Sequence, residues 1–423
     1  FLNVSQTTIE LAYGQLVAEG YVRSKPRSGF FVEHVDGLIP PLQTDTQPMA
    51  TEKPKQYTID FSPGRIDTYH FPFRTWRKYA RDLIDEGRHD LLQLGHPYGE
   101  YLLREQIARY LYASRGVEAS AEQIIIGSGT EQLLPMLMRL LPSQEPLAIE
   151  NPGYFIGHPL MEHLERPIVR IPVDRNGMKV DQLHQSKATA VYVTPSHQFP
   201  TGSVLSASRK AALFNWATAQ QERMIIEDDY DSEFRYRGKP IPALQSLDNG
   251  QHVVYMSTFS KSFMPSLRIA FMVLPFHLLS RYEKQFGQYA SNVPRFDQYL
   301  LAAFMRDGHY TRHLNRMRLL YKRKVQRVTE TLAQYDNITY EGDQAGLHLT
   351  VTIQTGQDEK TLMQAAEHAN IRITPLSTYG TFPKPYDPTF IIGFAAIEER
   401  QINEAIQQLM NVWSIPKRQN LND

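Results

Sequence analysis

Apolar and polar residues follow two different local patterns near the N-terminus. From Ile9 to Val17 the apolar positions recur at helical spacing, and Ser5 is a suitable N-cap, so this segment predicts one amphipathic helix. Two short β-like runs follow, residues 21–23 and 29–32, separated by a turn that is rich in basic residues. This pair of runs predicts a β-hairpin.

From Tyr57 onwards, helical stretches alternate with short apolar runs. Alternation of this kind predicts a mostly parallel sheet that is flanked by helices. After about Tyr310, a long basic helical segment precedes two further apolar runs, and this pattern predicts a smaller α+β lobe. The runs assigned to the large sheet are residues 123–127, 190–193, 224–227 and 252–256.

These patterns divide the chain into four expected parts. Residues 1–35 contain the helix and the hairpin, and residues 36–57 are a polar, proline-rich linker. Residues 58–309 form a large α/β domain, and residues 310–423 form the smaller C-terminal lobe. The chain opens with Phe1 instead of a methionine, so we expect it to lack its natural N-terminus.

Length and composition agree with more than one folded unit. A chain of 423 residues exceeds the size at which single cores stop growing, roughly 250–300 residues. Its 45 basic and 45 acidic residues balance, so a contact with nucleic acid must come from a local patch. The absence of cysteine excludes disulfides, and no apolar run reaches the roughly 20 residues of a transmembrane helix. We therefore expect a soluble, cytoplasmic protein without a membrane partner.

Residues suited to chemistry follow several apolar runs, where ligands bind in open α/β sheets. Residues 127–131, Gly-Ser-Gly-Thr-Glu, could bind a phosphate at a helix N-terminus or form an ordinary turn. Residues 227–231, Glu-Asp-Asp-Tyr-Asp, could bind a divalent metal or cap a helix. Residues 257–268 contain hydroxyl groups, Lys261 and an arginine. Together these groups suit pyridoxal 5'-phosphate (PLP), which requires an amine, an acid beside its ring nitrogen and a cationic phosphate site.

Four segments carry a specific family resemblance. Residues 257–268 resemble the fold-type I aminotransferases, and residues 194–202 and 226–234 resemble the MocR/GabR-type transcriptional regulators. Residues 4–32 resemble the end of a GntR-type winged helix-turn-helix, which aminotransferase enzymes lack. The resemblance covers nearly the whole chain. It implies an α/β, fold-type I aminotransferase-like domain, preceded by a partial winged helix-turn-helix.

The resemblance also implies which residues hold PLP. Lys261 would bond covalently to the cofactor aldehyde as the catalytic residue, and Asp228 would pair with the protonated ring nitrogen. Tyr230 would hydrogen-bond the phenolic oxygen, and Tyr154 would stack on the ring. No metal is implied. The residues that would hold the phosphate are Ser128, Gly129, Thr130, Thr258, Ser260 and Arg268.

The N-terminal segment implies a surface that reads a double-stranded DNA operator. Its helix would present a polar N-terminal end to base edges, and the hairpin wing would place basic residues on phosphates. Gln6 stands where this family would have an arginine, which implies a different operator. The expected DNA-binding residues are Ser5, Gln6, Thr7, Thr8, Arg23, Lys25 and Arg27.

Some positions depart from the aminotransferase pattern. Phe199 occupies the place of an asparagine before Pro-Thr-Gly, and His197 or Gln198 would substitute for that asparagine at the cofactor. Ala396 and Ile156 occupy the places of two arginines that bind ligand carboxylates. An apolar side chain cannot replace a guanidinium fork.

These departures bear on the effector that the protein would sense. They predict a ligand other than γ-aminobutyrate, and one that is not held as an ordinary α-amino acid. One candidate is a vitamer of B6, PLP itself included. The other is an amino compound whose acidic group binds to different basic residues, such as Arg65 or Arg295.

We therefore expect a PLP-dependent, DNA-binding transcriptional regulator that senses a small molecule. Only residual transaminase activity is expected, because a site that cannot orient a substrate carboxylate loses binding in the transition state. The alternative is a catalytically active PLP-dependent aminotransferase. The fold type also implies a homodimer, in which Tyr98 would reach the partner's cofactor phosphate.

Overall fold

The computed structural model of the chain describes residues 4–34, 55–142, 144–156, 158–238, 241–382 and 386–418. The chain forms two compact units, Phe1–Gln56 and Tyr57–Asp423. Of the linker expected at residues 36–57, only residues 55–57 are among those described. None of the described helices is long and apolar enough to cross a membrane.

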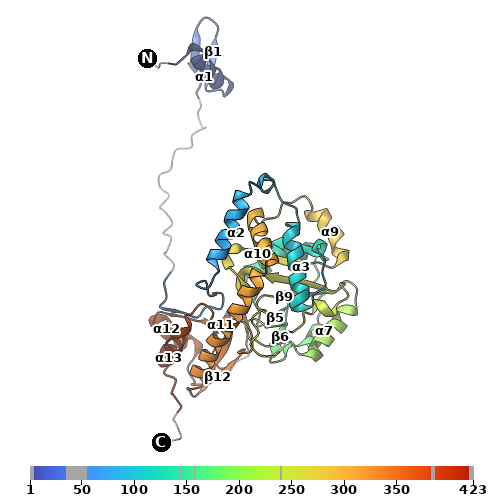
Figure 1. The fold of residues 1–423 in the computed structure, drawn as a ribbon, viewed down its shortest axis with the longest axis vertical. Coiled ribbons are helices and arrows are strands. Elements are labelled where there is room, and N and C mark those ends of the chain that lie inside the picture. Colours follow the sequence, from blue (N-terminus) through green and yellow to red (C-terminus); the bar gives the residue numbers. More distant parts are fainter. Residues whose placement is uncertain are drawn as a thin grey trace. The chain divides into compact units, whose positions relative to one another are not determined.

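The described part of the first unit contains a helix and a hairpin (Figure 1). Helix α1 (Gln6–Ala18) begins after Ser5, whose hydroxyl accepts a hydrogen bond from the backbone N–H of Thr8 at 3.2 Å. Strands β1 (Val22–Lys25) and β2 (Gly29–Val32) pair in antiparallel orientation. The predicted helix and hairpin are therefore confirmed.

An eight-stranded sheet forms the centre of the second unit. Its strands are β4 (Ile124–Gly127), β5 (Leu147–Asn151), β6 (Ile168–Asp174), β7 (Gly177–Met178), β8 (Ala190–Val193), β9 (Met224–Asp229), β10 (Val253–Thr258) and β11 (Ala270–Val273). They lie in the order β4-β11-β10-β9-β8-β5-β6-β7. Strands β10, β9, β8, β5 and β6 are parallel to one another, whereas β11 and β7 run antiparallel to their neighbours. The prediction of a mostly parallel sheet is confirmed.

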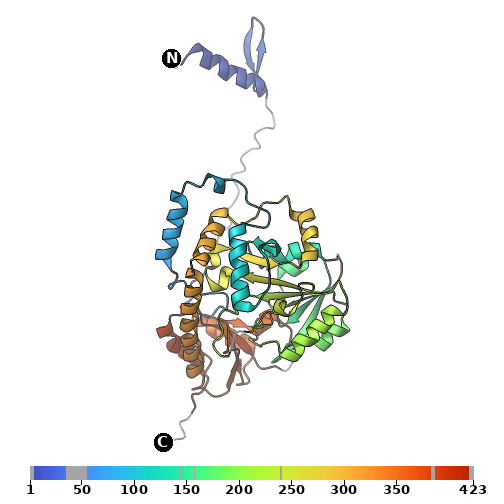
Figure 2. The ribbon, with the colours of Figure 1, turned by 45° about the vertical axis from the view of Figure 1, so that its right-hand side comes forward.

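Helices cover both faces of this sheet (Figures 1 and 2). They include α2 (Phe73–Asp85), α3 (Tyr101–Arg115), α4 (Thr130–Leu140), α5 (Pro159–His163), α6 (Val180–Gln185), α7 (Ala207–Thr218), α8 (Phe259–Ser262), α9 (Phe276–Phe286) and α10 (Arg295–Arg306). Successive side chains of a strand point to opposite faces. Accordingly, Ile126 packs in one core cluster with Ile107 of α3, whereas Ile125 packs in another with Leu133 of α4. The strand ends are thus fixed between two apolar layers.

A smaller sheet in the second unit has the order β12-β13-β16-β15. Helix α11 packs against both α10 and α13, and it runs from the large sheet towards this smaller one (Figure 2). Strand β3 pairs with β14. Residues 58–309 were expected to form the large domain, but their first strand, β3, therefore lies beside the small lobe. The elements are β3 (Ile59–Asp60), α11 (His309–Leu332), β12 (Ile338–Glu341), β13 (His348–Ile353), α12 (Glu359–His368), β14 (Ile371–Arg372), β15 (Thr374–Pro375), β16 (Thr389–Gly393) and α13 (Ile402–Val412).

Short 3-10 helices connect several of these elements. They are η1 (His89–Leu92), η2 (Ala121–Gln123), η3 (Gln245–Leu247), η4 (Pro265–Leu267), η5 (Leu376–Tyr379) and η6 (Glu399–Gln401). Two of them matter for function, because η4 leads into Arg268 and η5 ends at Tyr379, and both of these residues line the cavity described next.

Candidate functional site

A cavity of about 380 Å³ lies at the carboxyl ends of the parallel strands. Most of its lining comes from residues at or after the ends of β4, β8, β9 and β10. Tyr154 follows β5, Pro63 and Gly64 follow β3, and the small lobe contributes the rest. The lining includes Gly129, and its polar and aromatic side chains are Thr130, Glu131, Tyr154, Tyr192, Thr194, Phe199, Asp228, Tyr230, Asp231, Thr258, Ser260, Lys261, Arg268, His348 and Tyr379. The structure thus brings most of the residues expected at the cofactor together in one place.

Asp228 lies near the end of β9 and carries an unsatisfied oxygen. Its Oδ2 accepts a hydrogen bond from the hydroxyl of Tyr192, while its buried Oδ1 has no hydrogen-bond partner among the described residues. Burial raises the pKa of Asp228 to about 7; the Tyr192 hydroxyl opposes this rise, and Asp229 and Asp231 add to it. A cationic N–H donor would satisfy the free oxygen and favour the ionised form. The protonated ring nitrogen of PLP is such a donor.

Lys261 is held by backbone carbonyls at the edge of the same cavity. Its Nζ donates hydrogen bonds to the carbonyl oxygens of Pro63 at 3.1 Å and Gly64 at 3.0 Å. Burial lowers the pKa of Lys261, and the nearby carboxylate of Asp231 opposes this change. A lowered pKa increases the fraction of neutral amine, which is the form that reacts with an aldehyde.

The N-terminus of α4 and Arg268 form a region that suits an anion. Gly129 precedes the helix with a φ of 149°, which other residues rarely adopt, so the backbone favours glycine there. A Cβ atom at this position would also displace the guanidinium of Arg268, from which it would lie 2.5 Å away. The first N–H groups of a helix favour a phosphate. Arg268 also forms an ion pair with Glu131 at 3.1 Å, and the hydroxyls of Thr258 and Ser260 lie 3.0 Å apart.

Ser128 is the one expected phosphate residue that the structure does not bring to the lining. Its hydroxyl donates a hydrogen bond to Oε1 of Gln132 at 3.1 Å, and its backbone N–H donates to the same oxygen at 2.7 Å. The side chain therefore stabilises the first turn of α4 instead of facing the cavity.

Aromatic side chains form another wall of the cavity. Tyr154 makes an edge contact with Phe199 at 5.7 Å between ring centroids, and Phe199 makes one with Tyr379 at 4.8 Å. Tyr154 lines the cavity and remains 37% exposed, so part of its side chain is accessible to a ligand. A planar ring fits against such a surface.

His197 lies behind the lining, and it is buried in a hydrogen-bonded group. Its Nδ1 is 3.0 Å from Oδ2 of Asp231 and 3.0 Å from the hydroxyl of Tyr230. A ring nitrogen that donates to Asp231 cannot also accept from Tyr230. The Tyr230 hydroxyl is therefore left to donate to a ligand, and His197 fixes Asp231.

Gln198 is turned away from the cavity as well. Its amide donates to the carbonyl oxygen of Pro152 at 2.9 Å, and it also bonds Glu150 and Thr201. The structure therefore brings neither His197 nor Gln198 to the cavity in place of the expected asparagine, because both side chains already have partners within the protein.

His197, Asp231 and His348 lie close enough for one atom of each to bind a metal ion, within 4.8 Å of one another. Hydrogen bonds explain this cluster without a metal. Nδ1 of His197 is bonded to Asp231, and Nε2 of His348 lies 3.0 Å from the carbonyl oxygen of Pro200.

The expected position of the carboxylate-binding arginine is wrong. Ala396 does not line this cavity but a separate one of about 280 Å³, together with Arg65. Ile156 is buried in an apolar cluster with Phe155. The position of Ala396 along the sequence does not determine which cavity it lines, because the register of the small sheet decides which residues face each cavity.

Several lining residues were not found from the sequence. Those with a polar or charged side chain are Glu131, Tyr192, Thr194, Asp231, His348 and Tyr379. Glu131 and Asp231 belong to the motifs of residues 127–131 and 227–231, so their position beside other functional residues is a usable signal. His348 and Tyr379 come from the small lobe, and only the tertiary structure brings them to the large sheet.

The expected DNA-binding residues lie on the first unit, and several have local partners. The hydroxyls of Ser5 and Thr8 lie 2.8 Å apart, and Gln6 donates to Glu10 at 2.9 Å. Arg23 forms an ion pair with Glu33 at 2.7 Å. Thr7, Lys25 and Arg27 are also exposed.

Comparison with known proteins agrees with both units. Residues 58–409 match the family of aminotransferase class I and II. The uncharacterized HTH-type transcriptional regulator YdeL of Bacillus subtilis (strain 168) is 40% identical, over 98% of this chain and 90% of its own length. The probable rhizopine catabolism regulatory protein MocR of Rhizobium meliloti is 32% identical, over 97% of this chain and 87% of its own.

A solved structure extends the likeness to the three-dimensional fold. The kynurenine aminotransferase of Pyrococcus horikoshii, in complex with PMP, superposes with a TM-score of 0.75 at 25% identity, over 85% of this chain and 91% of that one. The helix and hairpin that precede the aminotransferase match are included in the match to the regulators. The chain therefore belongs to the HTH-type transcriptional regulators of which MocR is a member, and its second unit belongs to the aminotransferase class I and II family, whose cofactor is PLP.

Proposed function

We propose that this regulator senses a small molecule in the 380 Å³ cavity, with PLP bound there. The observation that carries the proposal is the unsatisfied Oδ1 of Asp228, a residue that lines the same cavity as Lys261 and the N-terminus of α4. These three features match the ring nitrogen, the aldehyde and the phosphate of PLP. When bound, PLP supplies an aldehyde that reacts with amines and a ring that withdraws electrons from the attached atoms.

The residues of the cavity take the roles expected from the sequence. Lys261 supplies the amine, Asp228 accepts from the ring nitrogen, and Tyr230 donates to the phenolic oxygen. Tyr154 covers one face of the ring. The phosphate contacts come from Gly129, Thr130, Thr258, Ser260 and Arg268, and Ser128 supports them by stabilising the first turn of α4.

Lys261→Ala tests the proposal directly. The unchanged protein should keep PLP after borohydride reduction and dialysis, whereas Lys261→Ala should lose it, because reduction fixes only a covalently bound cofactor. Absorbance and intact mass measure the retained PLP. Lys210→Ala is the matched control, since burial also lowers the pKa of Lys210 but this residue does not line the cavity. Equal retention by Lys261→Ala would refute the assignment.

A catalytically active aminotransferase is the second candidate, and the presence of Lys261 in an aminotransferase fold favours it. The two candidates differ in turnover. A sensor should bind its ligand with at most a few turnovers, whereas an enzyme should consume an amino donor and a keto acid continuously. Measured release of product over many equivalents of protein would decide for the enzyme.

The N-terminal unit is proposed to contact the DNA backbone through its hairpin. Joint replacement of Lys25 and Arg27 by alanine should reduce the slope of log affinity against log salt by about 1.8, because each lost phosphate contact contributes about 0.9. Arg23→Ala should change the slope less, since Glu33 already pairs with Arg23 at 2.7 Å. Fluorescence anisotropy with a duplex selected by the protein from random sequences measures both slopes. Unchanged slopes would place the DNA elsewhere.

The proposal includes a homodimer that presents two N-terminal units to repeated half-sites. Tyr98 does not line the cavity of its own chain but packs against Tyr282, with ring centroids 5.0 Å apart. In the dimer we assign Tyr98 to the phosphate of the partner's cofactor. The sensed molecule is a vitamer of B6 or an amino compound.

A further inference from the structure

We infer that the molecule sensed in this cavity is an amine that carries no carboxylate group. This inference rests on the proposed function and specifies its ligand. It follows from the charges that remain in the cavity once those assigned to PLP are set aside.

The positive charges of the cavity have assigned partners. Among its described lining residues, the lysine and arginine side chains are Lys261 and Arg268. Lys261 is assigned to the aldehyde of PLP, and Arg268 to its phosphate. Arg268 also pairs with Glu131 at 3.1 Å. A ligand carboxylate would therefore find no unused cation on the described lining.

The remaining charge on the lining is negative. Asp228 is assigned to the ring nitrogen, and Glu131 pairs with Arg268. This leaves Asp231, a buried carboxylate held by Nδ1 of His197 at 3.0 Å. Like charges in a site shielded from water repel each other more strongly than they do in water. A carboxylate on the ligand would lose its hydration and also face Asp231.

The wall contributed by the small lobe is uncharged. Burial lowers the pKa of His348 well below its usual value, so the ring is neutral at physiological pH. Its Nε2 lies 3.0 Å from the carbonyl oxygen of Pro200, to which it can donate. Leu347 and Tyr379 complete this wall, together with Phe199, whose ring lies 5.2 Å from that of His348.

The strand register explains why no arginine enters from the small sheet. His348 and Thr350 lie on the same face of β13, because side chains two residues apart share a face. Ile391 of β16 pairs with Thr350 and extends this face with an apolar side chain. Gly393 pairs with His348, and a Cβ atom there would meet the backbone oxygens of Ser62 and Phe61. This face therefore offers a carboxylate no positive charge.

Three arginines that do not line this cavity form ion pairs elsewhere. Arg65 pairs with Asp60 at 2.9 Å and lines the separate 280 Å³ cavity. Arg295 pairs with Glu100 at 2.7 Å, and the buried Arg115 pairs with Asp229 at 2.7 Å. Neither Arg65 nor Arg295, the two cations considered for the carboxylate of an amino acid, is therefore placed to bind one in this cavity.

Matched ligand pairs that differ only in the carboxylate test this inference. We would titrate the PLP-loaded protein with tyramine and tyrosine, and with cadaverine and lysine, and follow the absorbance of the cofactor. The same titrations of free PLP correct for the intrinsic reactivity of each amine. At least one amine should bind about tenfold more tightly than its amino acid, because an unpaired buried group costs roughly 1–3 kcal/mol. Equal or tighter binding of both amino acids, or no response to either amine, would overturn the inference.

Two variants identify the source of the preference. His348→Arg supplies a cation on the small-lobe wall and should narrow the ratio between amine and amino acid about tenfold or more. Asp231→Asn removes the repelling charge and should also narrow the ratio between the affinities for the amine and for the amino acid. Retention of PLP after reduction is measured separately, so failure of the proposed function appears as lost cofactor. Failure of this inference appears as an unchanged ratio in a protein that still holds PLP.

Discussion

Asparagine in place of Asp228 should weaken PLP binding by roughly 30-fold to several thousand-fold, because removing one member of a buried charge pair costs about 2–5 kcal/mol. We expect this loss because the substitution removes the carboxylate assigned to the ring nitrogen of PLP. Asp228 has one oxygen bonded by Tyr192 and one without a partner among the described residues, and the second is the oxygen assigned to the cofactor. Equilibrium dialysis of PLP against the two proteins measures the change.

The same substitution should stabilise the protein when PLP is absent. Burial raises the pKa of Asp228 from 3.8 to about 7. A raised pKa favours the folded state at low pH, and this contribution is lost as the pH rises from about 4 through 7. The free energy of unfolding of Asp228→Asn should therefore equal that of the unchanged protein near pH 4. At pH 8 it should be higher by up to about 4 kcal/mol.

Tyr192→Phe is the conservative control for this prediction. It removes the hydroxyl that lowers the pKa of Asp228 and leaves the carboxylate in place. PLP binding should weaken at pH 6.5 and recover at pH 8.5, where Asp228 is ionised in spite of the substitution. A loss of affinity in Asp228→Asn that also recovers at high pH would show that the carboxylate does not pair with the cofactor.

The sequence was sufficient where chemistry follows directly after a strand. Lys261 comes three residues after the end of β10, and Asp228 lies near the end of β9, so both could be placed at the carboxyl edge of the parallel sheet. The hydroxyls of Thr258 and Ser260 follow the same rule. Parallel strands bring their ends to one edge whatever the intervening helices contain.

The sequence was insufficient where the small lobe meets the large one. Ala396 was assigned to the site, but residues of β13 and η5 form that wall. A shift of one residue in a strand reverses the face to which its side chains point. The role of Ser128 could not be predicted either. Its motif is compatible with a phosphate contact, but in the structure its hydroxyl donates a hydrogen bond to Gln132.

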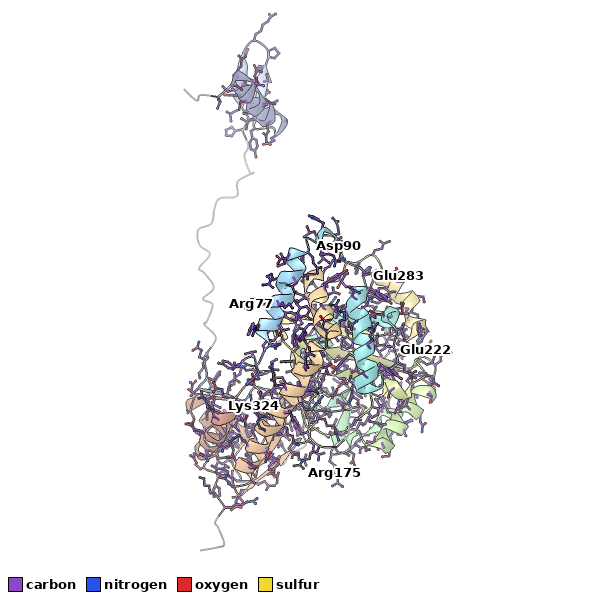
Figure 3. All side chains as sticks on the ribbon, in the orientation of Figure 1. Arg77, Asp90, Arg175, Glu222, Glu283 and Lys324 are labelled. Carbon is purple, nitrogen blue, oxygen red and sulfur yellow. The ribbon has the colours of Figure 1, made fainter. Side chains whose placement is uncertain are left out.

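A buried ion pair joins three segments of the second unit and provides the second large effect. Lys324 of α11, labelled in Figure 3, donates to Oδ2 of Asp67 at 2.8 Å and to the carbonyl oxygen of Ala395 at 2.6 Å. Only 1% of the Lys324 side chain and 5% of the Asp67 side chain are exposed. Burial opposes the charged form of Asp67, but hydrogen bonds from Lys324 and His70 prevail and lower its pKa.

Lys324→Met should lower the free energy of unfolding by about 3–5 kcal/mol, because Asp67 would remain buried without its cation. The double variant Lys324→Met with Asp67→Asn should recover most of this loss, whereas Lys322→Met, at an exposed site on the same helix, should change stability by about 0.5 kcal/mol or less. The three tryptophans, Trp76, Trp216 and Trp413, all lie in the second unit, so urea unfolding followed by tryptophan fluorescence reports on this unit.

The pH dependence distinguishes lost charge pairing from lost packing. A lowered pKa of Asp67 contributes stability above its unfolded pKa of 3.8, and this contribution is lost as the pH falls through the lower folded value. Methionine fills much of the lysine's volume, so the cost of Lys324→Met should be greatest near pH 7 and shrink towards pH 4, where Asp67 can be protonated without its partner. A cost that stays constant between these pH values would mean that the lysine stem stabilises the fold by packing, and that the ion pair contributes little.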